Sequence, residues 1–524
     1  MRATFSMSIA RNVAIVGAAT LASRVLGFVR DVAIAGLFGA GARADAFVVA
    51  FQFSNLVRRL LTEGALNSAF VPLYLRRRDE GGEKSAGAYA GKLIGTLTLV
   101  LLCVSALLAL AMPLLMIGLA PGFGGHDPRM TLAVEMARLM LPYLVLAGPI
   151  AVLMGVLNAN HRYSTAAAAA VMFNIVILIA IAVIVLMKWG DSDRSAWLVA
   201  IAVALAGLCQ LVLVGITVLI GPEKATPLGV LPRNDAQRFV ALAIPGLIAS
   251  GVPQLTMIVA VMIASDWPGA VSWLYYANRL VELPLGIVGI AIGTVMTPAL
   301  SHAARGKDRE LGPRTIRHGI EMALGLAFPA AIALMLLAWP IVHILFERGA
   351  FTSTDSYATA TMLGLLAIGL PGHVLVKALS PVFFAHEDTR TPMMAAGVGL
   401  IAAFFGSLAF MLAARPSGIA LSIAASGWIS AAMLWLLATR RGLLTIPVSA
   451  WRRLALIALS AAIMGAVVRL VAAQASLFAQ GDGRLLQIAL LTVVVGVGLL
   501  VYAACLWLFD IVRTSDLRTT FRPR

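Results

Sequence analysis

Charged residues are scarce in this chain, and their scarcity excludes most classes of soluble protein. Asp, Glu, Lys and Arg make up 12% of the 524 residues, whereas hydrophobic residues make up 60%. A soluble domain has about 25% charged and 45–50% apolar residues. Soluble enzymes, disordered chains and collagen-like fibres are therefore excluded. An outer-membrane barrel is excluded as well, because alternating strands do not produce uninterrupted apolar runs of about 20 residues.

The sequence also lacks the motifs of catalysis and metal binding. The three cysteines form no CxxC pair and lie inside apolar runs, where we interpret them as packing or lipid-facing residues (Cys103, Cys209 and Cys505). The seven histidines have no paired-ligand spacing, and neither a GxSxG nucleophile motif nor a Walker A motif is present. We therefore expect no enzymatic activity, no cofactor, no metal and no fused ATPase.

Long apolar runs dominate what is present, and they predict membrane-spanning helices. Reading the runs between polar or Gly/Pro breaks gives fourteen segments. They are residues 12–37, 44–75, 88–119, 131–157, 164–187, 196–220, 237–265, 269–302, 318–346, 356–384, 392–414, 417–439, 454–477 and 485–511. The predicted fold class is an all-α polytopic membrane protein with about fourteen transmembrane helices.

The distribution of basic residues predicts how these segments are oriented. With a cytoplasmic N-terminus, 25 of the 40 Lys and Arg residues fall on the cytoplasmic side and eight lie inside segments. The other side holds the remaining seven, which are Arg43, Arg129, Lys188, Arg194, Arg348, Arg415 and Arg484. Positively charged loops stay in the cytoplasm, so both termini are predicted to be cytoplasmic. The same rule explains the net charge of +16 without a nucleic-acid partner.

An internal repeat is indicated by landmarks that coincide when the chain is shifted by 226 residues. Ala46-Phe47 and Pro72 align with Ser272-Trp273 and Pro298. Ala159, which lies near His161 and Arg162, aligns with Ala385, which lies near His386 and Arg390. Six segments per copy predict two parallel six-helix lobes around a central cavity, plus two extra C-terminal helices. The predicted domains are residues 1–222, 223–441 and 442–524, and such lobes move a substrate by rocking.

Charges inside the predicted spans mark the candidate site. A charge at the bilayer centre costs at least about 2.5–3.5 kcal/mol, so it is expected to face a cavity or a partner. The segments with such charges read SRVLGFVRD, NLVRRLLTEGALNSAFVP and WLYYANRLVELP. They contain Arg24, Arg30 and Asp31; Asn55, Arg58, Arg59 and Glu63; and Arg279 and Glu282.

Two interpretations of these charges are open. They form internal ion pairs, such as Arg59–Glu63 and Arg279–Glu282, with Arg30-Asp31 as an interface anchor. Alternatively, Arg24, Arg58 and Arg279 converge on a polar cavity, where their forked N–H donors suit a phosphate or diphosphate. Three polar residues of the seventh segment, Ser250, Gln254 and Thr256, are candidates for a cation site or simply pack against other helices.

Several stretches resemble the MurJ (MviN) lipid II flippases of bacteria. They are residues 23–31, 45–72, 271–301, 345–355 (LFERGAFTSTD) and 375–392 (LVKALSPVFFAHEDTRTP), and the resemblance runs from about residue 12 to 511. It implies the multidrug/oligosaccharidyl-lipid/polysaccharide (MOP) exporter superfamily, fourteen spans and a lipid-tail groove formed by the last two. It also implies movement of lipid II, an undecaprenyl-diphosphate-linked disaccharide-pentapeptide, to the periplasmic leaflet of the inner membrane.

The resemblance also implies which residues matter and which departures to expect. Arg24, Arg58, Arg279, Glu63 and Asn55 are the expected substrate-binding residues, and Arg30, Asp31, Asp45 and Glu282 are the expected gating or supporting residues. Asp45 is a candidate gate contact. Asn278 stands where relatives often carry Asp, and Gln52 stands where some carry Lys.

Four functions compete at this stage. The first is a lipid II flippase, driven by the membrane potential or by an unidentified cation. The others are a flippase for another undecaprenyl-diphosphate-linked glycan, a multidrug antiporter of the same superfamily, and a membrane glycosyltransferase or polymerase. Mainly basic cavity charges argue against the antiporter, and short loops argue against the glycosyltransferase. Lipid II, membrane lipids and cell-wall synthesis enzymes are the expected partners.

Overall fold

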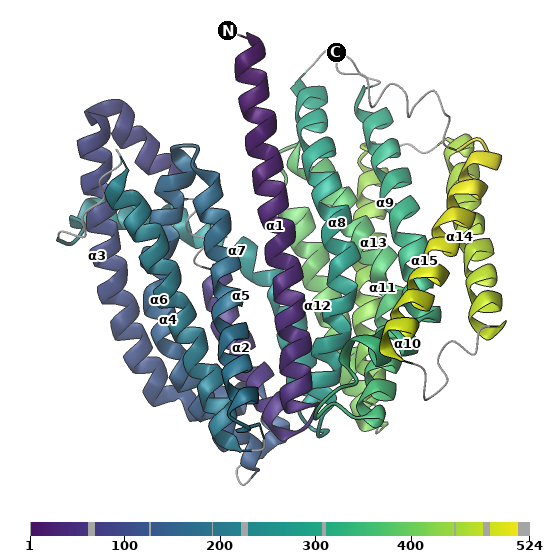
Figure 1. Cartoon of the computed structure of the whole chain (residues 1–524). Helices are drawn as coiled ribbons and strands as arrows, with labels where there is room; N and C mark the ends of the chain where they lie inside the picture. The colour runs from purple at the N-terminus through teal and green to yellow at the C-terminus, as the bar shows by residue number, and fades with distance from the viewer. Residues whose placement is uncertain are drawn as a thin grey trace. The chain divides into compact units, whose positions relative to one another are not determined.

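A computed structural model of the chain describes residues 2–60, 69–124, 127–190, 192–221, 229–305, 311–413, 416–444, 447–474 and 483–511. The described residues form α-helices and one short 3-10 helix, with no strand among them (Figure 1). The elements are α1 (Arg2–Phe38), α2 (Ala42–Arg59), α3 (Val71–Leu119), η2 (Pro121–Phe123), α4 (Pro128–Ala159), α5 (Tyr163–Leu186), α6 (Asp193–Ile220), α7 (Arg233–Ala264), α8 (Ala270–Arg305), α9 (Leu311–Leu336), α10 (Ala338–Phe346), α11 (Ser353–Phe384), α12 (Arg390–Leu412), α13 (Ser417–Arg440), α14 (Val448–Gln474) and α15 (Arg484–Leu508).

The prediction of an all-α membrane protein is confirmed. Ten of the described helices are long and apolar enough to cross a membrane. Inside lipid the backbone must satisfy its own hydrogen bonds, and a helix does so within one segment. Each predicted apolar segment overlaps one or two of the helices, which is consistent with about fourteen spans.

Two of the predicted segments differ in detail from the helices. The run 318–346 is divided into α9 and α10 at Leu337, which has φ −103° and ψ 15°. Pro340 has no N–H to donate to the carbonyl of residue 336, so the first helix ends there and a new one begins. The predicted second segment (44–75) also divides, because its end lies in the first part of α3. That part is separated from the rest of α3, which contains the predicted third segment, by a kink at Gly82 (φ 72°, ψ −177°). That backbone conformation is accessible to glycine alone.

Contacts divide the chain into two compact units. The first contains residues 1–272 and 348–351, and the second contains residues 273–347 and 352–524. In the first unit α4 is the central helix, because it packs against α2, α3, α5 and α6. In the second unit α11 has the same position and packs against α9, α10, α12 and α13, while α14 packs against α9 and α15. The predicted lobe boundaries at residues 222 and 441 stay a prediction.

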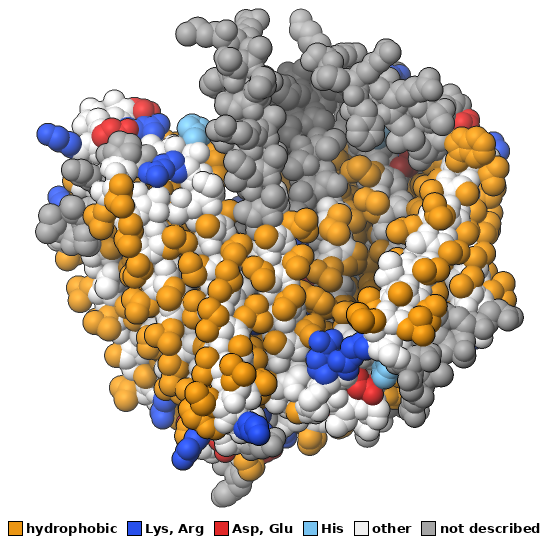
Figure 2. All heavy atoms as spheres, in the orientation of Figure 1, with side chains coloured by type: hydrophobic (Ala, Val, Ile, Leu, Met, Phe, Trp, Pro, Cys, Tyr) orange, Lys and Arg blue, Asp and Glu red, His pale blue; other side chains and the backbone are white. Residues whose placement is uncertain are grey.

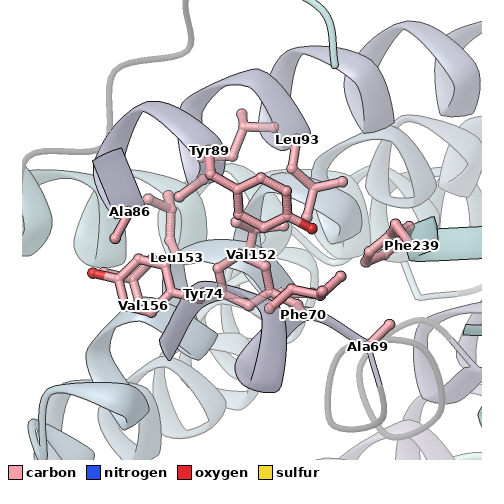
Figure 3. Close-up of a cluster of buried hydrophobic side chains, with 14 of the residues drawn as sticks. Ala69, Phe70, Tyr74, Ala86, Tyr89, Leu93, Val152, Leu153, Val156 and Phe239 are labelled. Atoms are coloured by element: carbon pink, nitrogen blue, oxygen red, sulfur yellow. The ribbon is translucent and has the colours of Figure 1, made fainter. Parts of the chain in front are cut away.

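An aromatic cluster joins three helices of the first unit. Phe70 stacks on Tyr89 with ring centroids 6.2 Å apart, and its centroid lies 5.5 Å from that of Tyr74. Val152 of α4 and Phe239 of α7 belong to the same buried cluster (Figure 3). Lipid tails are as apolar as these side chains, so close packing holds membrane helices together more than the exclusion of water does.

The backbone repeats itself at the predicted offset of 226 residues. His161 and Glu387 both have φ 59°, a left-handed conformation that is uncommon outside glycine. His161 lies two residues after the end of α4, and Glu387 lies three residues after the end of α11. A left-handed residue therefore occurs in the turn after the central helix of both units.

Candidate functional site

The predicted site residues lie mainly on α1, α2 and α8. Arg24 is exposed on α1, and among the described residues none forms a hydrogen bond or ion pair with it. Glu63 lies outside the described residues, so the Arg59–Glu63 pair stays a prediction. Arg24 and Arg58 belong to the first unit and Arg279 to the second. Their convergence on one cavity therefore also stays a prediction.

Arg30 and Asp31 form a buried ion pair rather than an exposed interface anchor. Their exposed fractions are 5% and 0%. Arg30 donates from Nε and a terminal nitrogen to one carboxylate oxygen of Asp31, at 3.0 and 2.7 Å. A second terminal nitrogen donates to Oδ1 of Asn174 on α5, at 3.1 Å, and the guanidinium carbon lies 4.9 Å from the centre of the Phe51 ring. The pair thereby links α1 to α5 and α2.

Arg58 and its neighbour Arg59 have neutral partners. Arg58 donates twice to Oδ1 of Asn55, at 3.0 and 2.8 Å. Arg59 donates to Oε1 of Gln254 on α7, at 2.7 Å. A neutral amide accepts from a guanidinium and fixes its orientation without adding a negative charge. The polar residue Gln254 thus contacts an arginine in this structure.

Asp45 is completely buried and contacts the turn between α7 and α8. One carboxylate oxygen accepts hydrogen bonds from the backbone N–H and the hydroxyl of Ser272, at 3.0 and 2.6 Å. The other accepts from the backbone N–H of Gly269 at 2.7 Å, and a nitrogen of Arg129 lies 3.5 Å away. These contacts fasten the start of α2 to the start of α8, which is compatible with the predicted gate contact.

Arg129 is a supporting residue that the sequence had assigned only to a loop. It is buried, its guanidinium lies 4.5 Å from the centre of the Phe123 ring, and it pairs with Asp127 at 2.7 Å. Burial would raise the pKa of Asp127, but hydrogen bonds from Arg129 outweigh it and hold the pKa below its ordinary value. Asn174 was missed too, although an asparagine inside the apolar run 164–187 is the kind of signal that marks such a partner.

In the second unit, Arg279 and Glu282 form the predicted ion pair, at 3.0 Å. Asn278, which stands where relatives often carry Asp, also contacts this pair. Its Nδ2 atom donates to the other carboxylate oxygen of Glu282 at 3.2 Å. A carboxylate at position 278 would instead repel Glu282. Lys377 of α11 lies against the same helix, since a Cβ atom on Gly289 would be 3.0 Å from its Nζ atom.

The chemistry of these groups suits anion binding rather than metal binding. No group of three or more His, Cys, Asp or Glu side chains in the described part of the chain is arranged to hold a metal ion. Guanidinium groups in a low-dielectric environment bind planar or tetrahedral oxyanions through paired N–H donors.

A family model and two curated relatives all point to one protein family. The family model described as lipid II flippase MurJ matches residues 34–493. A probable lipid II flippase MurJ from Rhizobium tropici is 36% identical over 470 residues, 88% of this chain and 87% of that protein. The lipid II flippase MurJ of Burkholderia cenocepacia is 32% identical over 85% of this chain and 87% of its own length.

Solved structures show the same relationship. A lipid II flippase MurJ in an inward closed conformation matches with a TM-score of 0.78 and 25% identity, covering 95% of this chain and 99% of that one. An inward-facing multidrug resistance transporter of the MATE family, described as a member of the MOP superfamily, matches with a TM-score of 0.66 and 15% identity. The match covers 80% of this chain and 94% of that one, and it shows that the two chains share a fold. This chain is a multi-pass membrane protein and belongs to the lipid II flippase MurJ family.

Proposed function

We propose that this protein flips lipid II from the cytoplasmic to the periplasmic leaflet of the bacterial inner membrane by alternating access. The observation that carries the proposal is the set of arginines inside apolar helices of a chain that belongs to the MurJ family. Lipid II has a diphosphate that must leave water to cross the bilayer. Cationic side chains lower the free energy of that step by replacing water around the phosphates.

Arg24, Arg58 and Arg279 are the proposed headgroup-binding residues. Arg24 has no described partner, and Asn55 accepts two hydrogen bonds from Arg58 and so orients its guanidinium. Glu282 compensates Arg279 in this state, and Glu63 is proposed to compensate a cavity arginine when the site is empty. Arg30 and Asp31 are proposed to hold α1 against α5, and Asp45 to close one end of the pathway.

A groove in the second unit offers an apolar surface for a lipid tail. It has a volume of about 260 Å³ and lies between α9 and α14, with Gly465 facing Ile332, so it involves only one of the two C-terminal helices to which the tail groove was assigned. Its lining is apolar except for Arg469 at one end. An undecaprenyl chain needs such a surface along the bilayer while its headgroup is inside the protein.

The reset of the empty transporter is proposed to depend on the membrane potential or on a coupled cation. Moving one elementary charge across 100 mV is worth about 2.3 kcal/mol, so a basic cavity responds to the potential. Contacts with cell-wall synthesis enzymes stay a prediction.

The sidedness of lipid II in cells tests the proposed function. After rapid inactivation of the protein, an externally added lipid II hydrolase reports the fraction facing the periplasm. We expect cleavage to fall, wild-type protein to restore it, and an Arg24→Ala copy present at normal levels to fail. Unchanged cleavage, with another lipid-linked glycan trapped inside, would transfer the assignment to that glycan.

A further inference from the structure

A cavity that the proposed flipping cycle does not use lies between α1 and α5 of the first unit. Its volume is about 740 Å³, and it is lined by apolar residues of both helices, by Lys188 and Gly190, and by residues 348–350. Val29 and Val185 on its walls are 44% and 59% exposed. Because α5 is long and apolar enough to span the membrane, the cavity opens toward lipid.

Hydrophobic side chains cover the face of the molecule on which α5 lies, and Lys and Arg side chains appear at the lower edge of that face (Figure 2). The two charged residues among the described lining of the cavity are Lys188 and Arg348, and both are basic. A third basic residue, Arg43, donates a hydrogen bond to the backbone carbonyl of Gly190 beside them.

The clustering of these three residues is unusual for this chain. Only seven basic residues are predicted on the non-cytoplasmic side, and Arg43, Lys188 and Arg348 are three of them. They come from three distant parts of the sequence. Basic side chains at one end of an apolar cavity that opens toward lipid complement a phosphate headgroup attached to an acyl chain.

Close backbone packing holds Arg348 at the cavity. The N–H of Ala350 donates to the carbonyl of Gly36 on α1 at 2.9 Å. A Cβ atom on Gly349, which has φ 58°, would lie 2.2 Å from that carbonyl oxygen, and a Cβ atom on Gly36 would lie 3.2 Å from Cγ of Arg348. The segment 348–350 therefore rests directly on α1, and glycine is required at position 349.

Lys188 is placed by the end of α5. It has φ 57°, the left-handed conformation that ends the helix and turns the chain away. The next residue, Trp189, is 41% exposed. Tryptophan favours the boundary between acyl chains and headgroups, so the basic end of the cavity lies at headgroup depth.

We propose that this cavity binds one membrane phospholipid with a net negative headgroup. An acyl chain lies along the exposed apolar faces of α1 and α5, and the phosphate lies between Lys188 and Arg348. Because α1 also contains Arg24, Arg30 and Asp31, a bound lipid would brace the helix on which the first unit's buried ion pair lies.

Native mass spectrometry of the purified full chain tests this proposal, with phosphatidylglycerol and phosphatidylcholine as probes. We expect one phosphatidylglycerol to bind with at least tenfold higher affinity than phosphatidylcholine. Lys188→Gln and Arg348→Gln should each weaken phosphatidylglycerol binding about fivefold. Arg194→Gln, which removes a charge on the same predicted side but outside the cavity lining, should leave it unchanged. Ala33→Phe fills the apolar part of the cavity without changing a charge, and it should abolish lipid binding.

Each alternative result overturns the proposal. Equal binding of the two lipids, or equal loss in Arg194→Gln, would mean that these two basic residues do not select the headgroup. Displacement of the lipid by millimolar inorganic phosphate would identify the ligand as a soluble anion. Because lipid binding is measured directly, the result does not depend on whether lipid II is the transported substrate.

Discussion

Asp45 shows how much depends on a single buried carboxylate. It accepts three hydrogen bonds from Gly269 and Ser272 and lies 3.5 Å from Arg129, with no exposed surface. A buried charge is tolerated only when its hydrogen-bonding capacity is satisfied, and removing one member of such a group leaves the others uncompensated. The start of α2 is therefore held to the α7–α8 turn by polar contacts.

Replacing Asp45 should destabilise the first unit more than replacing its partner. We expect Asp45→Ala to lower the free energy of unfolding by about 3 kcal/mol, because Arg129 and two backbone N–H groups lose their acceptor. Ser272→Ala should cost only about 1 kcal/mol, since one hydroxyl donor is lost. Chemical unfolding in detergent measures both. Equal, small losses would mean that the contact does not fasten this turn.

At the scale of elements, the packing of α1 against residues 348–350 depends on glycine. Gly39 follows α1 with φ 67°, and a Cβ atom there would lie 2.4 Å from the carbonyl oxygen of Ala350. Both the backbone conformation and the available space exclude a larger residue.

Gly39→Ala should therefore lower the free energy of unfolding by about 1–3 kcal/mol, the cost of a strained backbone together with a displaced loop. Gly41→Ala is the matched control. It lies two residues away with open space around its Cβ position, and we expect a change within about 0.5 kcal/mol. Thermal unfolding followed by size-exclusion chromatography compares the two. A similar loss in both variants would contradict the steric argument.

The loop between α11 and α12 contains a pH-dependent contact of the second unit. The N–H and hydroxyl of Thr391 donate to Asp388 at 3.0 and 2.6 Å, and Arg441 after α13 donates at 2.5 Å. The hydrogen bonds from Thr391, followed by that from Arg441, hold the pKa of Asp388 well below its ordinary value. A lowered pKa means that the stabilisation is complete above the unfolded-state pKa, near 4, and is lost as the pH falls below it.

We therefore expect the wild-type protein to lose stability between about pH 5 and pH 2 more steeply than Asp388→Asn, which cannot titrate at this position. The midpoint of thermal unfolding measured across this range provides the comparison. Parallel pH profiles would show that the carboxylate contributes nothing to stability.

At the scale of the whole molecule, the distribution of basic residues predicts which loops face the cytoplasm. The loop containing Glu83 is predicted to be cytoplasmic and the loop containing Asp193 to be on the other side. Both side chains are exposed, so a cysteine at either position is accessible to a reagent that reaches its side of the membrane.

In a variant whose three native cysteines are replaced, Asp193→Cys should react with a membrane-impermeant maleimide in intact spheroplasts. Glu83→Cys should react only after the membrane is opened. The reverse pattern would place both termini outside the cytoplasm and would change the proposed direction of transport.

The amino-acid sequence is enough to predict the class of protein and the approximate positions of the long helices among the described residues. A backbone in lipid must satisfy its hydrogen bonds locally, and a long apolar run does so as a helix. The sequence also identified which charges have to be accommodated inside the membrane. It predicted the Arg279–Glu282 pair correctly, because residues three apart on a helix are neighbours whatever surrounds them.

The partners of the other charges depend on how the helices pack against one another. Arg30 donates a hydrogen bond to Asn174, which lies 144 positions away in the sequence. Asp45 accepts one from Ser272, which lies 227 positions away. Helical periodicity specifies which face a residue lies on, but not which helix packs against that face. The gathering of Arg43, Lys188 and Arg348 at one lipid-facing cavity likewise depends on packing that no local pattern contains.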